Sequence, residues 1–361
     1  MIIESLGLNN YRNYKNLELN FSRGINIFYG DNAQGKTNIL EAVYMSGTTK
    51  SHRTNKDFEL INFKEDECHI STRILKNDIS HKIDIHLKNN KSKGIAIDGI
   101  PIKKASELFG MINFVFFSPE DLNIIKNGPS EKRRFMDIEL CQLNKLYLSN
   151  LANYNKIVIQ RNKLLKDLNF KKDLEDTLDV WDLQLAEYGQ KIIEMREEFI
   201  GHLNKIIFGI HQSISGGKEN LQIRYLKNCE KENLLEKIKA NREKDLKLKI
   251  TSVGPHKDDL GFYFDEMDVR KYGSQGQQRS AALSLKLSEI ELVKESIGDT
   301  PILLLDDVLS ELDKNRQNYL LNHIHDIQAM ITCTGLDEFV NCRFSVDKIF
   351  KVTDGVVESK N

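Results

Sequence analysis

The sequence lacks an excess of charge of either sign, since 52 lysine and arginine residues face 53 aspartate and glutamate residues. A chain that attracts nucleic acid through its overall field carries a clear positive charge. Any affinity of this protein for nucleic acid must therefore come from a local basic patch. Its 361 residues, 40% of them hydrophobic, are enough to bury a large core, so we expect one large or two modest globular domains.

Cysteine pairs and long apolar runs are missing as well. The five cysteines are scattered, and none of them has the C-x-x-C spacing of a zinc ribbon. This pattern also argues against a disulfide framework and favours a reducing compartment, so we expect a cytoplasmic protein. No segment approaches the roughly 18 apolar residues of a membrane helix, and MIIESLGLNNYRNYKN lacks the regions of a secretory signal. We therefore expect no export and no membrane partner.

The pattern of apolar residues predicts an α/β core. The first hundred residues favour strands, with a helix from Gly35 to about Tyr44, and strands alternate with helices again after Ile250. The apolar run ILLL is typical of a strand buried in a sheet that is covered on both faces. The strand segments are LELNF, INIFY, HISTRIL, SHKIDIHL, KGIAIDGI, GFYF, PILLLDDV, AMITC and KIFKV, and further helices are expected at about 277–293 and 314–325.

Between about 130 and 200 the spacing of apolar residues changes from every second residue to every third or fourth residue. Two series of apolar residues, one running from Met136 to Val158 and the other from Leu174 to Phe199, predict two amphipathic helices. The helices would join near DLNFKKD and fold back as a hairpin with their apolar stripes in contact. We interpret the stripes as core, and a partner-binding role stays open. This helical arm, about 130–205, would be inserted into the α/β core.

The segment GDNAQGKT matches the phosphate-binding motif G-x-x-x-x-G-K-[ST], and it follows an apolar strand and precedes a helix, as that motif requires. In such a loop, backbone N–H groups and a helix N-terminus face phosphate oxygens. Lys36 would add a positive charge near the β and γ phosphates, and Thr37 would offer a hydroxyl to Mg²⁺. The predicted nucleotide-binding residues are Gly30, Asp31, Asn32, Ala33, Gln34, Gly35, Lys36, Thr37 and Asn38.

Two carboxylates end the apolar strand of PILLLDDV. In α/β sheets, ligands bind at the carboxyl edge, so Asp306 is the predicted second metal-binding residue beside Thr37. Asp307 follows, where it could orient or deprotonate an attacking water.

The segment GSQGQQR opens a second helix that can attract an anion. Ser274 and Gln277 have the S-x-x-Q spacing of a capping box. Glycines at such a helix start let a phosphate approach the backbone. Because the first loop already wraps one triphosphate, we expect a symmetric dimer. Ser274 and Gly276 of one copy would meet the γ-phosphate that Gly35 and Lys36 of the other copy hold.

These motifs, in this order, resemble those of ABC-type ATPases: a Walker A loop, a signature loop, a Walker B strand and a D-loop at 310–313. Within that superfamily the chain resembles the RecF family, whose members have an SMC-like head. The resemblance rests on NYRNY, GDNAQGKTNILEAVY, KSHRT, FFSPEDL, GPSEKRRFMD, TSVGPHKDDL, YGSQGQQRS and LLLDDVLSELD. It implies an ABC-type P-loop ATPase head with an inserted α-helical arm. Lobe I would comprise 1–118 and 285–361, and lobe II would comprise 119–284 with the signature motif at 273–279.

The resemblance also implies a mechanism. ATP and Mg²⁺, bound by Lys36, Thr37 and Asp306, would close a homodimer on double-stranded or gapped DNA. Slow, DNA-stimulated hydrolysis with Asp307 as the hydrolytic carboxylate would reopen it. Ser274 and Gln277 would act across the dimer, and Arg12 would lie beside the nucleotide. RecR and possibly RecO are the implied partners in assisting RecA loading at gaps.

The chain departs from transporter-type ATPases in three motifs. Asp307 replaces the usual glutamate, which predicts slow turnover. AMITCTG has no switch histidine, and the resemblance to the RecF family implies that Thr334 or Thr332 would replace it. FFSPEDL likewise lacks the glutamine of a Q-loop. A transporter ATPase subunit, a nuclease or helicase, and an SMC head are the rival interpretations. Against the last stands the short helical insertion, because SMC proteins carry hundreds of residues of heptads.

Three basic clusters, at Lys50–Arg53, Lys132–Arg134 and Arg161–Lys163, are candidate DNA contacts. No helix-turn-helix or zinc finger is visible, so binding would be to phosphates and sensitive to salt. His256 and Asp258 suggest a catalytic pair or metal site, but no third ligand is spaced to complete one. We therefore favour a structural or communication role for them.

Overall fold

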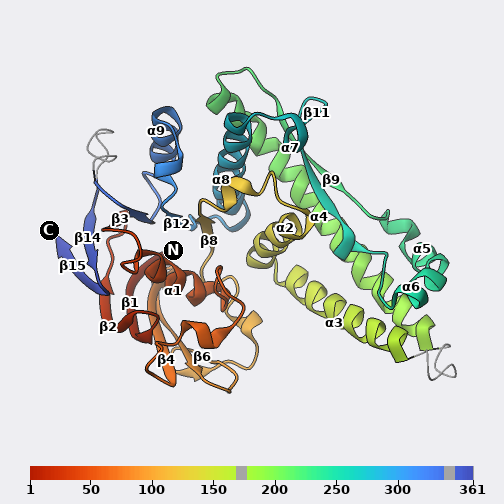
Figure 1. Cartoon of the computed structure of the whole chain (residues 1–361), viewed down its shortest axis with the longest axis horizontal. Helices are drawn as coiled ribbons and strands as arrows, with labels where there is room; N and C mark the ends of the chain where they lie inside the picture. The colour runs from red at the N-terminus through yellow and green to blue at the C-terminus, as the bar shows by residue number, and fades with distance from the viewer. Residues whose placement is uncertain (168–176, 337–345, 361) are drawn as a thin grey trace. The chain divides into compact units, whose positions relative to one another are not determined.

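The computed structural model describes residues 1–167, 177–336 and 346–360 (Figure 1). By its internal contacts the chain divides into two compact units. The first unit joins Met1–Leu122 to Leu285–Asn361, and the second is Asn123–Ser284. Within the described ranges, no helix combines the length and the apolar character needed to span a membrane.

A mostly parallel sheet in the first unit orders its strands β15-β14-β3-β13-β12-β8. All neighbours run parallel except β14 and β15, which form an antiparallel hairpin. Every residue of β12 is buried, as the run ILLL predicts for a strand covered on both faces. The α/β class expected from the sequence is thereby confirmed. The strands are β3 (Ile25–Tyr29), β8 (Phe114–Phe117), β12 (Ile302–Asp306), β13 (Ala329–Cys333), β14 (Lys348–Thr353) and β15 (Val356–Lys360).

An antiparallel sheet with the order β2-β1-β4-β5-β6-β7 forms the other layer of this unit. Along β5 the side chains of Ile83, Ile85 and Leu87 are buried in alternation, as their period of two predicts. The segment KGIAIDGI is a hairpin and not one strand, because Asp98 and Gly99 turn the chain with φ angles of 52° and 77°. The strands are β1 (Ile2–Tyr11), β2 (Tyr14–Asn20), β4 (Glu67–Lys76), β5 (Ile79–Lys88), β6 (Gly94–Ile97) and β7 (Ile100–Pro101).

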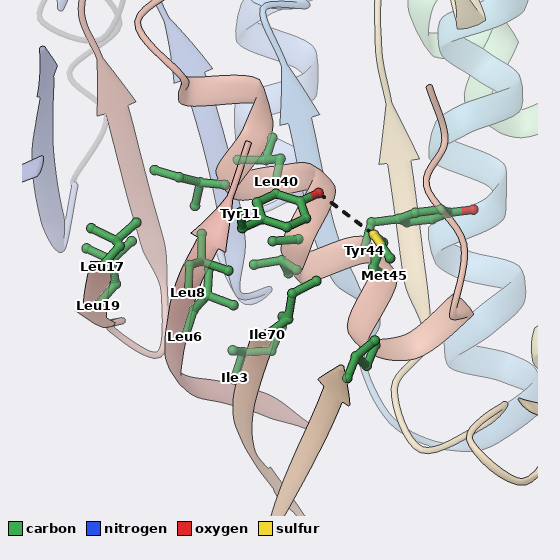
Figure 2. Close-up of a cluster of buried hydrophobic side chains, with 14 of the residues drawn as sticks. Ile3, Leu6, Leu8, Tyr11, Leu17, Leu19, Leu40, Tyr44, Met45 and Ile70 are labelled. Atoms are coloured by element: carbon green, nitrogen blue, oxygen red, sulfur yellow. Dashed lines mark hydrogen bonds between the residues drawn. The ribbon is translucent and has the colours of Figure 1, made fainter. Parts of the chain in front are cut away.

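Helix α1 (Lys36–Thr48) lies between these two sheets and shares one core with both. Figure 2 shows part of this core, in which Leu40 and Met45 of α1 meet Leu6 and Leu8 of β1 and Ile70 of β4. The helix runs four residues beyond the expected end. All residues of the helix after its first turn are buried, and this packing holds the start of α1 at one position relative to both sheets.

The remaining helices of the first unit follow the expected positions. Helix α9 (Lys314–His323) is capped by Asp313, whose carboxylate accepts the N–H groups of Asn315 and Arg316 at 3.1 Å each. Helix α8 (Gln275–Ile297) begins in the second unit and ends in the first. Short 3-10 helices lie at Asp57–Leu60, Ala105–Glu107, Asp121–Asn123 and Leu309–Glu311.

The helical arm of the second unit differs from the prediction of two helices. Its described residues form α2 (Pro129–Leu143), α3 (Lys145–Asp167) and α4 (Leu178–Ser215), and the predicted joint near DLNFKKD falls almost wholly outside them. Asn144 separates α2 from α3: its backbone is extended, and its side chain accepts the N–H groups of Leu146 and Tyr147 at 2.8 and 3.1 Å. A helix cap thus interrupts an apolar pattern that continues across it. Helices α3 and α4 pack on each other, as the hairpin prediction requires.

A small antiparallel sheet with the order β11-β10-β9 completes the second unit. Helix α4 packs on β9, and α2 packs on β10. The strands are β9 (Leu221–Leu226), β10 (Asp259–Phe264) and β11 (Met267–Asp268), and the helices are α5 (Leu234–Ala240), α6 (Arg242–Leu248) and α7 (Val269–Tyr272), with 3-10 helices at Lys231–Asn233 and Pro255–Lys257.

Arg161, predicted as a DNA contact, is instead a fully buried anchor of the arm. Its guanidinium donates hydrogen bonds to Asp182 and Asp245 at 2.7 Å each and to Thr251 at 3.0 Å. Lys132 is also buried and donates to the carbonyl of Leu260 at 2.8 Å. The prediction of DNA contacts is therefore wrong for these two residues, because a buried and bonded cation cannot reach a phosphate.

His256 and Asp258 lie in a second buried polar network. His256 Nδ1 lies 2.7 Å from the hydroxyl of Tyr154, and Asp258 accepts a hydrogen bond from Arg196 at 3.2 Å. Burial lowers the pKa of His256 to about 4 and raises the pKa of Asp258. Among the described residues, no group of three or more His, Cys, Asp and Glu side chains could hold a metal. Of the two roles expected for this pair, structural and communication, these buried contacts support the structural one.

Replacing Arg161 tests its role as an anchor. The change Arg161→Ala leaves the buried carboxylate of Asp245 without its guanidinium, so we expect a loss of about 3 kcal/mol of unfolding free energy in urea denaturation. The control is Lys163→Ala, two residues along the same helix at an exposed position. Equal urea midpoints for the two variants would contradict the assignment.

Candidate nucleotide-binding site

The loop Gly30–Thr37 connects β3 to α1 at the carboxyl edge of the parallel sheet. Three of its residues, Gly30, Ala33 and Gly35, have positive φ angles of 152°, 64° and 111°. Gly35 occupies the N-cap of α1 and has no side chain with which to cap the first turn. Asp31, Asn32 and Ala33 are exposed. The backbone N–H groups at this helix start are therefore available to an anion.

Residues from both ends of the chain brace this loop. The side-chain amide of Asn13 donates to the carbonyl of Gln34 at 3.1 Å, and the Tyr14 hydroxyl donates to that of Gly35 at 3.0 Å. The N–H of Asp354 donates to the side chain of Gln34 at 2.5 Å. The sequence motif alone did not identify Asn13 and Tyr14, although both lie in the segment NYRNY. Asn38, which follows the loop, also donates to Asn13, at 2.8 Å.

Lys36 places its ammonium group inside the loop. Its Nζ donates to the carbonyls of Gly30 and Asp31 at 2.6 and 2.8 Å, and the residue is only 6% exposed. A positive charge is thus enclosed by the same residues whose N–H groups favour an anion, which is the arrangement that binds phosphate.

Thr37 and Asp306 meet across the sheet edge. The Thr37 hydroxyl donates to Asp306 Oδ1 at 2.9 Å, and the Thr332 hydroxyl donates to the same oxygen at 2.7 Å. Asp306 is buried, and this burial raises the pKa of its carboxyl, while the two hydroxyls oppose the shift. A hydroxyl and a carboxylate are hard oxygen ligands, so this donor set fits Mg²⁺.

Asp307 adopts a left-handed backbone conformation, with φ of 54°. Its N–H donates to Thr332 Oγ1 at 2.9 Å, and its carbonyl accepts the hydroxyl of Ser310 at 2.8 Å. Burial raises the pKa of the Asp307 carboxyl, and the positive charge of Lys36 opposes this shift. The carboxylate therefore lies within the field of the residue that would neutralise a phosphate.

Arg12, predicted to lie beside the nucleotide, has a defined partner in α1. Its guanidinium donates two hydrogen bonds to the buried carboxylate of Glu41, at 2.8 and 2.9 Å, and a third to the carbonyl of Glu59. Burial alone would raise the pKa of Glu41, but the hydrogen bonds from Arg12 and Ser51 lower it. The sequence motif did not reveal the pair of Arg12 and Glu41. This pair connects the turn that carries Asn13 and Tyr14 to the helix that begins at Lys36.

The signature segment forms the start of α8 in the second unit. The N–H of Ser274 donates to the side chain of Gln277 at 2.8 Å, and the N–H of Gln277 donates to the Ser274 hydroxyl at 3.2 Å. The predicted capping box is confirmed. Ser274 and Gly276 are exposed. The structure thus brings Lys36, Thr37, Asp306 and Asp307 together in the first unit and holds Ser274, Gly276 and Gln277 together in the second.

Comparisons with known proteins cover the full length of the chain. A family model described as the RecF/RecN/SMC N terminal domain matches residues 2–358. The chain is 61% identical over 363 residues to the DNA replication and repair protein RecF of Lachnospira eligens, with 100% of both chains covered. It is 62% identical over 358 residues to the protein of the same name from Agathobacter rectalis, with 99% of each covered.

Solved structures show the same likeness. The recombination mediator protein RecF with ATP, in the RecFOR pathway, has a TM-score of 0.93 at 37% identity, covering 100% of this chain and 98% of that chain. An SMC head bound to the C-winged helix domain of ScpA has a TM-score of 0.59 at 16% identity, covering 100% of this chain and 97% of that chain. The second likeness shows a shared fold alone.

The tight packing at Gly35 can be tested. A Cβ at this position would lie 2.6 Å from Asn13 Nδ2 and 2.7 Å from the Tyr14 hydroxyl, at a φ of 111°. We expect Gly35→Ala to weaken binding of a fluorescent ATP analogue at least about tenfold, since the loop must move. Gly201→Ala, in α4 with open space around it, should bind as the unchanged protein does. Unchanged affinity in Gly35→Ala would show that the loop does not hold the phosphates.

Proposed function

Because this chain belongs to the RecF family of DNA replication and repair proteins, we propose that it is an ATP-gated recombination mediator that pairs with a second copy of itself on DNA. The observation that carries the proposal is the division of phosphate-binding groups. The Walker A and Walker B residues form one assembly in the first unit, and an exposed, capped signature loop stands at the start of α8 in the second. One triphosphate between two copies would use both.

The chemistry of the proposed site follows from its residues. The N–H groups of the loop and the Lys36 ammonium would bind the phosphates of ATP, and Thr37 and Asp306 would hold Mg²⁺. The metal, when bound, would neutralise charge on the phosphates. Asp307 would orient the attacking water. Its side chain is one methylene shorter than the glutamate of transporter ATPases, which favours slow turnover.

DNA phosphates would contact basic side chains that remain exposed. After the assignment of Lys132 and Arg161 to the interior, the cluster at Lys50–Arg53 stays a candidate: Arg53 has 47% of its side chain exposed and donates to Asn38 beside the loop. Contacts of this kind are salt-sensitive and largely independent of sequence. A basic group one hydrogen bond from the nucleotide loop would let double-stranded or gapped DNA stimulate hydrolysis.

The cellular role rests on the relatives. Curated relatives over the whole chain are DNA replication and repair proteins, and the solved RecF structures concern the RecFOR pathway. We therefore propose RecR and RecO as partners, assistance to RecA loading at gaps as the outcome, and the cytoplasm as the location. No observation favours the alternatives of a transporter subunit, a nuclease or a helicase.

Replacing the signature serine tests the two-copy site. We expect Ser274→Arg to bind ATP as well as the unchanged protein does, yet to weaken ATP-dependent dimerisation at least about tenfold in multi-angle light scattering, because the arginine would occupy the space of the phosphate. Ser213→Arg, at an exposed position of α4 in the same unit, is the control and should still dimerise. The shared site would be refuted if Ser274→Arg dimerised as well as Ser213→Arg. It would also be refuted if Ser274→Arg lost nucleotide binding while its dimerisation was unaffected.

A further inference from the structure

Thr332 contacts both Walker B carboxylate residues with one hydroxyl. It lies near the end of β13, fully buried, in register with Asp306 of β12 on one side and Phe28 of β3 on the other. The hydroxyl donates to Asp306 Oδ1 at 2.7 Å and accepts the N–H of Asp307 at 2.9 Å. It therefore fixes the direction of the Asp306 carboxylate and the peptide that leads to Asp307.

The backbone of Asp307 is held on both sides. A left-handed conformation is less favourable than a right-handed one for a residue with a Cβ, although aspartate adopts it more readily than most, so hydrogen bonds to its peptide groups help to keep it there. The peptide N–H of Asp307 is held by Thr332 and its carbonyl by the hydroxyl of Ser310. These two hydroxyls determine where the Asp307 side chain starts.

Thr37 shares Asp306 Oδ1 with Thr332, but its position gives it a different task. Thr37 lies in the first turn of α1 beside the phosphate loop, where its oxygen is a ligand of the donor set that fits Mg²⁺. Thr332 lies in β13, which pairs with β12, the strand that ends at Asp306. Of the two threonines expected in place of the switch histidine, Thr334 is exposed, whereas Thr332 makes both contacts.

We propose that Thr332 is a positioning residue for ATP hydrolysis, which orients Asp306 for the metal and Asp307 for the attacking water through a single hydroxyl. The inference rests on the proposed ATPase function and deepens it. Thr332, a residue of β13 that touches neither nucleotide nor metal, would couple metal binding to water activation. Loss of this hydroxyl should lower kcat and raise the Mg²⁺ requirement while leaving nucleotide binding without metal intact.

The experiment compares three variants of the full-length chain with the unchanged protein, with gapped DNA present. Thr332→Val removes the hydroxyl at nearly constant volume, Thr332→Ser retains it, and Thr72→Val is the matched control. Thr72 is also a fully buried strand threonine of the first unit, bonded to Ser46 at 2.5 Å. We expect Thr332→Val to lower kcat at least about tenfold with KM for ATP changed less than about threefold, and Thr332→Ser to restore most of kcat.

A second readout does not depend on turnover. Binding of a fluorescent ATP analogue in EDTA should be unchanged in Thr332→Val, whereas the Mg²⁺ concentration that half-saturates the metal-dependent binding should rise. If Thr332→Val does not fold, Thr332→Ala takes its place, since it also removes the hydroxyl that contacts Asp306 and Asp307 and should lower kcat in the same way. Normal kcat in Thr332→Ala would then overturn the proposal.

The outcomes separate this inference from the function on which it rests. Equal kcat and Mg²⁺ dependence for Thr332→Val and Thr72→Val, or a Thr332→Ser variant as slow as Thr332→Val, would overturn the role of Thr332 alone. Failure of the unchanged protein to hydrolyse ATP would overturn the proposed function itself.

Discussion

The site depends on one buried carboxylate oxygen that two hydroxyls share. Asp306 Oδ1 accepts hydrogen bonds from Thr37, at the start of α1, and from Thr332, in the next strand of the sheet. A buried carboxylate needs such partners, because an unpaired one is costly to bury. Residues separated by 269 and 26 positions in the sequence are thereby held at one sheet edge. The loop Gly30–Thr37, Asp306 and Asp307 therefore have fixed relative positions.

The phosphate loop has a second constraint, which comes from both ends of the chain. Asn13 and Tyr14 of the N-terminal turn bond to its carbonyls, and Asp354 of the β14–β15 hairpin bonds to Gln34. The pair of Arg12 with Glu41 attaches that turn to α1. Both segments of the first unit, Met1–Leu122 and Leu285–Asn361, therefore supply contacts that hold this loop.

The local features of the site could be predicted from the sequence, and the distant ones could not. The phosphate loop, the apolar strand before Asp306 and the capping box at Ser274 each occupy a few consecutive residues, so their patterns carry their geometry. Arg12 pairs with Glu41, and Arg161 is buried against Asp182 and Asp245, through long-range contacts that no short sequence pattern encodes. Charge runs were therefore misleading, since a buried arginine and an exposed one are identical in sequence. The helix break at Asn144 has no sequence signal, because the apolar period continues across it.

We propose that two copies of the chain bind one nucleotide between them, with the loop Gly30–Thr37 from one copy and the signature segment at Ser274 from the other. A crystal structure with Mg²⁺ and a nonhydrolysable ATP analogue would show whether the nucleotide is shared. We expect its phosphates to contact Gly35 and Lys36 of one copy and Ser274 of the other, with Thr37 and Asp306 at the metal. A nucleotide bound in the loop of a chain whose Ser274 and whose neighbours' Ser274 contact no phosphate would contradict it.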